Sequence, residues 1–260
     1  MRISVIGAGV MGEALIAALI KAGHAPAQIE VIEKRAERAA ELVNKYAIKI
    51  GSDLSNVDVL LLVTKPQDVD AVLADINGKV KAGALVVSFA AGKKIATIAN
   101  GLSGMNPVVR VMPNTPTLVG KGAAGYSLGF GVTDHQKEFL INFLGAAGIA
   151  VEVKEELQDA VTATSGSGPA YFFAFVESMV KGAMDLGLTE DVATQLTVQT
   201  IIGAAELLAT SGKSATTLRE NVTSPNGTTH AALQSFSASE LEVIVAKAMK
   251  AARDRSIELS

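Results

Sequence analysis

Short, unbroken apolar runs alternate with amphipathic segments over the first 155 residues of the chain. Such runs predict strands that are buried on both faces of a parallel sheet. The expected strands are residues 3–6, 30–32, 57–63, 84–89, 108–111 and 149–153. Amphipathic helices are expected up to residue 21, over residues 35–46, and from a Thr133 cap to residue 144. The alternation predicts an α/β fold with a doubly wound parallel sheet and right-handed crossovers.

After Glu156 the strand pattern ends and only helical segments follow. They are expected at residues 169–186, 190–209, 216–221, 227–236 and 240–257, the last one starting with a capping box at Ser239. These helices are rich in small residues, which favours close packing, often against a second copy of the chain. We therefore expect an α/β domain over residues 1–156 and an all-helical domain over residues 157–260.

Composition excludes several classes of function. The chain is 49% hydrophobic and 19% charged, has a formal net charge of -3, and lacks a basic stripe, so nucleic acid is not an expected partner. Cysteine is absent, which excludes disulfides and thiol catalysis and fits a reducing cytoplasm. No pair of carboxylates or histidine cluster predicts a metal site.

The N-terminal apolar run, residues 3–20, could be taken for a signal peptide. Glu13 interrupts this run, and its glycines have a better explanation in a strand-to-helix turn. No other apolar run approaches ~18 residues, so we expect no membrane span and a cytoplasmic location.

The first candidate site is the glycine loop Gly7-Ala8-Gly9-Val10-Met11-Gly12, between the first strand and the first helix. Gly7 permits a tight turn, Gly9 lets the backbone approach a pyrophosphate, and Gly12 lets the helix pack on the strand. An ordinary strand-to-helix turn is the alternative. The position after a strand and before a helix favours a dinucleotide.

Charged residues follow the second strand. Glu33 lies where an acidic group accepts hydrogen bonds from a ribose 2′-OH, which favours NADH. Lys34 and Arg35 could instead bind a 2′-phosphate, which favours NADPH. A solvated charge run that opens the next helix is the third interpretation, and the sequence leaves the three open.

Later strand ends carry prolines, which stop a strand ladder, and small residues, which leave room for a flat nicotinamide ring. Each end taken singly is equally well an ordinary strand-to-loop transition; three in succession favour a cofactor wall. The candidate cofactor contacts there are Thr64, Lys65, Pro66, Ala90, Ala91, Met112 and Asn114.

A second candidate site starts another helix, at Ser224-Pro225-Asn226-Gly227-Thr228-Thr229. The free amides of a helix N-terminus can hold a carboxylate while a threonine hydroxyl faces the reacting atom. The alternative is a plain helix start with Ser, Asn and Thr as generic caps.

Five motifs together resemble those of the pyrroline-5-carboxylate reductase family, in order and spacing and over essentially the whole chain. They are Val63-Thr-Lys-Pro-Gln67, Ser88-Phe-Ala-Ala-Gly92, Arg110-Val-Met-Pro-Asn-Thr-Pro116, Ser165-Gly-Ser-Gly-Pro-Ala-Tyr171 and Val222-Thr-Ser-Pro-Asn-Gly-Thr-Thr229. The resemblance implies a Rossmann-type domain followed by an all-helical dimerisation domain, in a homodimer that often builds a decamer. It implies reduction of the cyclic imine acid 1-pyrroline-5-carboxylate to L-proline by NADPH or NADH, with NADPH slightly favoured.

The resemblance also implies residue roles. Ser224 and the amides around Gly227 and Thr228 hold the substrate carboxylate, and Thr229 places its hydroxyl on the ring nitrogen. Asn221 matches a contact to both substrate and cofactor, and Glu155 matches a substrate contact. The chain departs from the family at Asn226, where glycine is usual, although asparagine tolerates the positive φ of such a turn.

Two other functions compete with this interpretation. A β-hydroxyacid dehydrogenase needs a lysine soon after a glycine-rich turn, but the first lysine after Gly168 is Lys181. A dinucleotide sensor without turnover has no reason to keep a carboxylate grip. Ser167 has no His or Lys partner in its motif, and His230 is expected to pack rather than to donate a proton. A six-membered imine acid stays open as a substrate, because one methylene discriminates by only ~1–3 kcal/mol.

Overall fold

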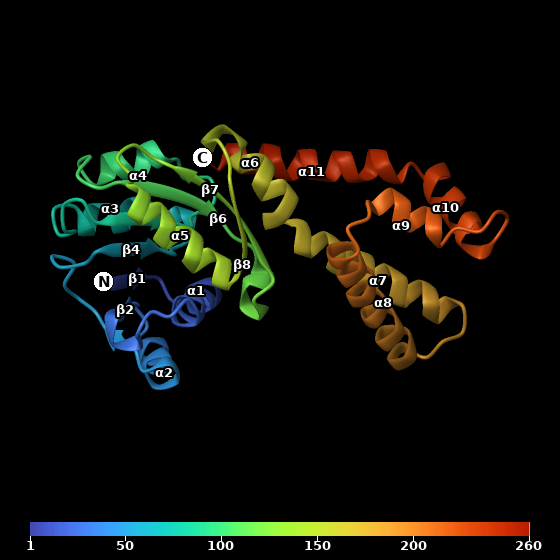
Figure 1. Ribbon diagram of the computed structural model, residues 1–260, viewed down its shortest axis with the longest axis horizontal. Coiled ribbons are helices and arrows are strands. Elements are labelled where there is room, and N and C mark those ends of the chain that lie inside the picture. Colours follow the sequence, from blue (N-terminus) through green and yellow to red (C-terminus); the bar gives the residue numbers. More distant parts are fainter. Residues whose placement is uncertain (260) are drawn as a thin grey trace. The chain divides into compact units, whose positions relative to one another are not determined.

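The computed structural model describes residues 1–259 and divides into two compact units (Figure 1). Unit 1 contains Met1–Pro169 and the segment that starts at Ala251, and unit 2 contains Ala170–Lys250. Each unit is described by itself.

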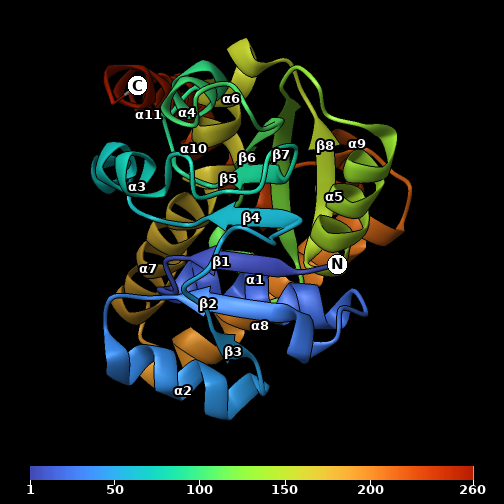
Figure 2. The same ribbon diagram turned by 90° about the vertical axis from the view of Figure 1, so that its left-hand side faces the viewer.

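Unit 1 is built on one eight-stranded sheet with the order β3-β2-β1-β4-β5-β6-β7-β8 (Figure 2). The strands are β1 (Ile3–Ile6), β2 (Ile29–Ile32), β3 (Lys49–Ile50), β4 (Val59–Leu62), β5 (Leu85–Ser88), β6 (Val108–Met112), β7 (Gly122–Leu128) and β8 (Gly148–Glu152). The order changes direction at β1, whose neighbours are β2 and β4, and ligands bind at such a switch point.

The six strands expected from the apolar runs are confirmed, but the sheet is not purely parallel. The missed strand β7 pairs antiparallel with β6, because only the nine residues 113–121 connect them. This connection contains the 3₁₀ turn Thr115–Val119 and Gly120, at φ +70°. A parallel neighbour needs a longer crossover connection. Small residues in β7 and the two exposed residues of β3 gave no strand pattern.

Helices cover both faces of this sheet. On one face, α1 (Val10–Lys21), α2 (Ala36–Tyr46) and α5 (Asp134–Ala146) contribute to a core that includes Ile16, Leu42 and Phe143. On the other, α3 (Val69–Ile76) and α4 (Ile95–Gly101) contribute Leu73 and Ile98. The expected Thr133 cap of α5 is confirmed as a capping box with Gln136.

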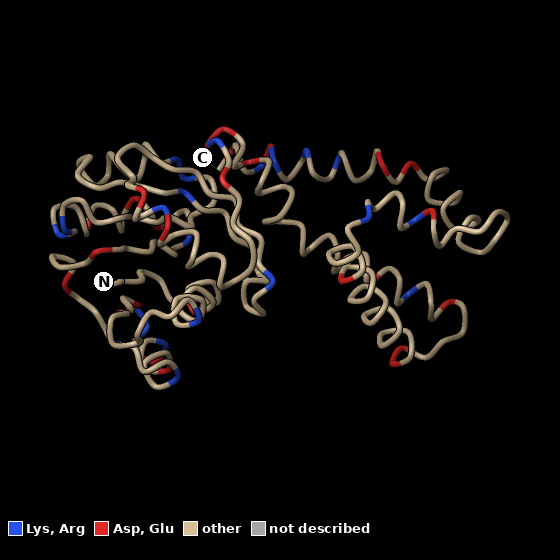
Figure 3. The backbone as a smooth tube through the Cα atoms, in the orientation of Figure 1, with Lys and Arg blue, Asp and Glu red and all other residues tan. Residues whose placement is uncertain are grey.

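After β8 the described chain is helical, as expected. Unit 1 also holds α6 (Gln158–Val161) and a π-helical turn, Thr162–Gly166. The remaining helices are α7 (Gly168–Asp185), α8 (Glu190–Thr210), α9 (Ala215–Asn221), α10 (Thr228–Ala238) and α11 (Leu241–Glu258). Charged residues are sparse along α7 and α8 (Figure 3). Both helices carry many exposed apolar side chains.

Two details differ from the sequence-based expectation. Ser239 does not open α11: it closes α10, Glu240 turns the chain at φ +55°, and the Glu240 carbonyl accepts the first bond of α11. Only two residues connect α10 to α11, so Ser239 serves as the C-cap of α10 and is not available to cap α11.

Among residues 1–259, α8 alone is long and apolar enough to cross a membrane by length and composition.

An ion cluster joins α1 to α2. The Glu13 carboxylate accepts hydrogen bonds from Lys45 and the Tyr46 hydroxyl and pairs with Arg38. Lys45 and then Arg38 lower the pKa of Glu13 to about 2, from an ordinary value of 4.5. Because the folded state favours the charged form, this stabilisation is present above pH 4.5 and is lost as the pH falls towards 2.

We predict that Glu13→Gln lowers the free energy of unfolding by up to about 3 kcal/mol at pH 7 and by much less near pH 2. Urea unfolding at both pH values measures the difference. The matched control is Glu37→Gln, an exposed acid on α2. An equal loss at both pH values would show that Glu13 acts through packing and not through charge.

Candidate functional site

The glycine loop has the backbone geometry that its sequence predicts. Gly7 has φ +89°, and a Cβ atom there would lie 2.8 Å from the Val63 carbonyl oxygen. A Cβ on Gly12 would overlap the Gly7 carbonyl oxygen, whereas Gly9 has open space around it. Two glycines are therefore required by packing within the protein, and the third leaves the backbone accessible.

The loop ends at the N-terminus of α1. Gly9 is the N-cap residue, is exposed, and offers no side chain to the first amides of the helix. Unpaired amides and the helix dipole make such an end suitable for a phosphate.

A cleft of about 790 Å³ lies beside this loop at the carboxyl ends of the strands. Its lining includes seven of the candidate cofactor contacts: Gly7, Gly9, Glu33, Lys34, Arg35, Thr64 and Lys65. Thr64 Oγ1 is buried there and has no hydrogen-bond partner among residues 1–259. Because buried hydroxyls are normally paired, this orphan group and the open backbone at Gly9 fit a polar ligand such as a dinucleotide.

Glu33 is engaged on both of its carboxylate oxygens. Oε2 accepts the Ala8 amide at 2.9 Å, and Oε1 accepts the backbone amide and Nε of Arg35, each at 3.1 Å. Burial acts to raise the pKa of Glu33, but the hydrogen bonds from Arg35 and Ala8 lower it below the ordinary value. Glu33 is thus a carboxylate that fixes the glycine loop and holds the largely exposed Arg35 side chain.

Arg38 is a contact that the sequence analysis missed. Its Nε donates to the Ala8 carbonyl at 3.0 Å, and the guanidinium pairs with Glu13 and Glu41. Its position on α2, one turn after the charged residues at the strand end, could have suggested this role. The glycine loop is therefore held from both sides, through the amide and the carbonyl of Ala8.

The remaining candidate cofactor contacts of unit 1 follow the strand ends but do not line the cleft. They are Ala8, Val10, Met11, Gly12, Pro66, Ala90, Ala91, Met112 and Asn114. Asn114 Oδ1 accepts the Ala123 amide at 2.9 Å, and the Met112 side chain lies against Gly166. Asn114 and Met112 thus hold β7 and the π-helical turn at the end of β6.

Glu155, a candidate substrate contact, also has partners within unit 1. Its Oε1 accepts the amide of Ile95, the first residue of α4, at 2.6 Å, and lies 3.8 Å from Arg110 Nη1. The carboxylate therefore caps α4 and faces a buried guanidinium.

In unit 2 the segment from Ser224 forms a tight turn into α10. The Gly227 amide donates to the Ser224 carbonyl at 3.0 Å, and Asn226 adopts φ +59°, as expected for the residue in the usual glycine position. Gly227 is the N-cap residue, without a side-chain cap. The first-turn amides of α10 are thus uncapped by side chains, next to the Thr228 and Thr229 hydroxyls.

Asn221 ends α9, three residues before Ser224, and is exposed. His230 follows Thr229 in the first turn of α10 and is half-buried. Among the described residues, no group of three or more His, Asp or Glu side chains could hold a metal ion.

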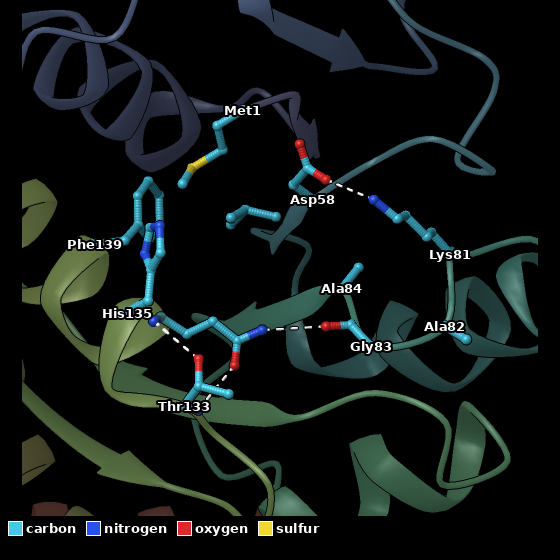
Figure 4. A pocket seen from close by; sticks show the side chains of 11 residues that line it. Met1, Asp58, Lys81, Ala82, Gly83, Ala84, Thr133, His135 and Phe139 are labelled. Atoms are coloured by element: carbon cyan, nitrogen blue, oxygen red, sulfur yellow. Dashed lines mark hydrogen bonds and ion pairs between the residues drawn. The ribbon is translucent and has the colours of Figure 1, made fainter.

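A second cavity, of about 450 Å³, lies at the opposite, amino ends of the strands (Figure 4). Its lining includes the Asp58–Lys81 ion pair, His135 and Phe139, and none of the candidate site residues. Ligands of doubly wound sheets bind at the carboxyl ends, so this cavity is not the dinucleotide site.

The sheet order, the glycine loop and the cleft are those of a dinucleotide-binding domain, and an all-helical region follows it. Sequence models agree: residues 2–92 match NADP oxidoreductase, coenzyme F420-dependent, and residues 155–259 match pyrroline-5-carboxylate reductase dimerisation. The pyrroline-5-carboxylate reductase of Pseudomonas aeruginosa is 42% identical over 100% of this chain and 97% of its own length. The pyrroline-5-carboxylate reductase of Corynebacterium melassecola is 41% identical over 99% of this chain and 98% of its own length.

Solved structures extend this similarity to the fold. The Coxiella burnetii pyrroline-5-carboxylate reductase gives a TM-score of 0.93 at 33% identity and covers 100% of this chain and 98% of its own. The Plasmodium falciparum pyrroline carboxylate reductase with NADP bound gives a TM-score of 0.85 at 28% identity and covers 100% of this chain and 98% of its own. The chain belongs to the pyrroline-5-carboxylate reductase family.

We predict that Gly12→Ala lowers the free energy of unfolding by about 1–3 kcal/mol, because the new methyl group overlaps the Gly7 carbonyl. It should also weaken NADPH binding. The matched control is Gly145→Ala on α5, which has open space and should be neutral or slightly stabilising. Urea unfolding and calorimetric titration with NADPH measure both effects. Equal stability of the two variants would contradict the packing role of Gly12.

Proposed function

We infer that the chain catalyses the reaction of its family. It is a pyrroline-5-carboxylate reductase: hydride passes from NADPH or NADH to the C=N bond of 1-pyrroline-5-carboxylate and gives L-proline, the last step of proline biosynthesis. The observation that carries this function is the uncapped start of α10, with Ser224 and Thr229 beside it, in a chain that also holds a dinucleotide loop.

The cofactor would be held by the glycine loop and the cleft beside it. The pyrophosphate fits the open backbone at Gly9 and the first amides of α1, and Thr64 Oγ1 supplies a hydrogen bond that no protein group uses. When bound, the reduced nicotinamide supplies the hydride. The small residues Ala90 and Ala91 and the end of β6 at Met112 are proposed to leave room for its ring.

NADPH is the proposed preferred cofactor. Both Glu33 oxygens already accept hydrogen bonds from Ala8 and Arg35, so Glu33 is less available to a ribose 2′-OH. Arg35, held by Glu33, and the exposed Lys34 both line the cleft and offer positive charge to a 2′-phosphate. NADP bound in the Plasmodium falciparum relative agrees with this choice.

The substrate carboxylate is proposed to bind at the start of α10. The Ser224 hydroxyl and the amides around Gly227 and Thr228 provide donors, and the helix dipole favours an anion. The positive φ of Asn226 keeps the turn that presents these donors, although glycine is usual there in the family.

Thr229 is the proposed catalytic residue. Its hydroxyl would lie on the ring nitrogen and orient the proton that this atom takes up. A neutral hydroxyl is a weak acid, so positioning contributes more than proton donation. Asn221 is proposed to contact both substrate and cofactor. For Glu155 we retain a substrate contact as a proposal, beside its observed contact with the start of α4.

The helical region is proposed to form a homodimer. The match of residues 155–259 to a dimerisation domain and the exposed apolar side chains of α7 and α8 support this assembly. A second copy covering α8 also accounts for its apolar surface without a membrane. A decamer, a cytoplasmic location and a functional domain boundary at residue 156 remain predictions.

The function is tested by following oxidation of NADPH and NADH by absorbance, with and without 1-pyrroline-5-carboxylate, and by identifying proline as the product. Oxidation that depends on the imine is the expected result. A folded protein that binds NADPH but does not oxidise it with this substrate would overturn the function and favour a dinucleotide sensor. A six-membered imine acid in the same assay measures ring-size selectivity.

We predict that Thr229→Ala lowers kcat by about 10- to 100-fold and leaves NADPH affinity unchanged, because only the substrate nitrogen loses a partner. Thr229→Ser keeps the hydroxyl and should retain most of the activity. Steady-state kinetics and NADPH titration measure the two properties. Unchanged turnover in Thr229→Ala would remove this residue from the mechanism.

We predict that the double change Lys34→Ala/Arg35→Ala raises the KM for NADPH by about ten-fold or more and leaves the KM for NADH nearly unchanged. The reason is the loss of charged hydrogen bonds to the 2′-phosphate. Lys49→Ala, on exposed β3, controls for the loss of positive charge. Equal effects on both cofactors would contradict 2′-phosphate recognition by this pair.

A further inference from the structure

A buried arginine lies in β6, two residues before the strand end at Met112. The Arg110 side chain is only 5% exposed. Two carboxylates lie beside its guanidinium: Glu155 at 3.8 Å from Nη1 and Asp159 at 3.6 Å from Nη2. A buried charge is costly unless it is paired, so the positions of these three side chains depend on one another.

The end of α11 takes part in this cluster. Ser256 is buried and donates from Oγ to Asp159 Oδ1 at 2.7 Å, the same oxygen that faces Arg110. The hydrogen bond therefore fixes the orientation of the Asp159 carboxylate towards the guanidinium. The contact joins positions 97 residues apart in the sequence, both within unit 1.

The other side of the cluster reaches the start of α4. Glu155 Oε1 faces Arg110 and also accepts the Ile95 amide. Ala91 lies in the loop between β5 and α4, and Ile95, the first residue of α4, follows it by four residues. The cluster thus connects the two strand ends, β5 and β6, whose loops carry the proposed nicotinamide wall.

The segment that contains Glu155 and Asp159 is itself hydrogen-bonded to the sheet. Gln158, between Glu155 and Asp159, is fully buried, and its Nε2 donates to Ser127 Oγ at 2.9 Å and to the Gly125 carbonyl at 3.3 Å on β7. These hydrogen bonds hold the segment that carries Glu155 and Asp159 against β7, and the two carboxylates in turn contact Arg110 and the Ile95 amide.

We propose that Ser256 and Asp159 are positioning residues for the cofactor site: they hold Arg110 and, through Glu155, the loops after β5 and β6. The inference rests on the proposed use of those loops as the nicotinamide wall. Neither residue touches the cleft that receives the rest of the dinucleotide.

The test compares Ser256→Ala and Asp159→Asn with the wild-type enzyme. Both variants are expected to raise the calorimetric Kd and the KM for NADPH about three- to ten-fold. The kcat at saturating NADPH should stay within about two-fold. Amide hydrogen exchange should become faster in residues 88–95 and 110–116 and stay unchanged in β1 and β2.

Ser103→Ala is the matched control, because it removes one serine hydrogen bond, to Asn77, at the far end of α4. Because Ser103 is exposed and Ser256 is buried, the control should lose less stability than Ser256→Ala and should leave the NADPH affinity unchanged. Unchanged Kd and exchange in both test variants would overturn the proposal, as would an equal change in all segments and in the control. Because Kd and exchange need no turnover, these results stay interpretable if the wild-type enzyme fails to reduce the imine.

Discussion

The contact between α1 and the strand end that precedes it is the constraint on which the cofactor site depends. Gly12 packs directly on the Gly7 carbonyl, and Gly7 packs on the backbone at Val63. Any side chain at either position would push the helix away from β1 and β4. Because the start of α1 then lies at the switch point of the sheet, its N-cap residue, Gly9, lines the cleft at the carboxyl ends of the strands.

Electrostatic contacts hold this arrangement from outside the loop. Arg38 binds the Ala8 carbonyl, Glu33 binds the Ala8 amide, and Glu13 ties Arg38 to α1. Glu33 thus has a structural task besides any contact with ribose. Glu33, whose position after the second strand favours NADH as one of the interpretations open from the sequence, here holds Arg35, a group suited to the phosphate of NADPH.

The proposed carboxylate site at the start of α10 depends on the same type of interaction as the start of α1, namely the binding of an anion by free backbone amides. The starts of α1 and α10 both have a glycine N-cap residue and no side-chain cap, so both present backbone donors to an anion. Around α1 these donors adjoin a cleft suited to a phosphate group, whereas around α10 they adjoin hydroxyl side chains suited to a small polar acid. In the proposed function one type of backbone site would therefore serve both ligands, and nearby side chains would supply the chemistry.

Most of the fold could be predicted from the sequence, because buried parallel strands require apolar runs and tight turns require glycine. The six expected strands, the Thr133 cap and the positive φ of Asn226 all follow from such local rules. β3, β7 and the true role of Ser239 did not, since two-residue strands, small-residue strands and short helix connections carry little local signal. The sequence by itself determined the glycine loop, the segment before α10 and the family. Only the tertiary structure decided that Glu33 binds Arg35 and Ala8, and that Ser256 meets Asp159 beside Arg110. Local backbone preference acts over a few residues and can be read along the chain, whereas the pairing of buried charges depends on which distant segments the packed core brings together.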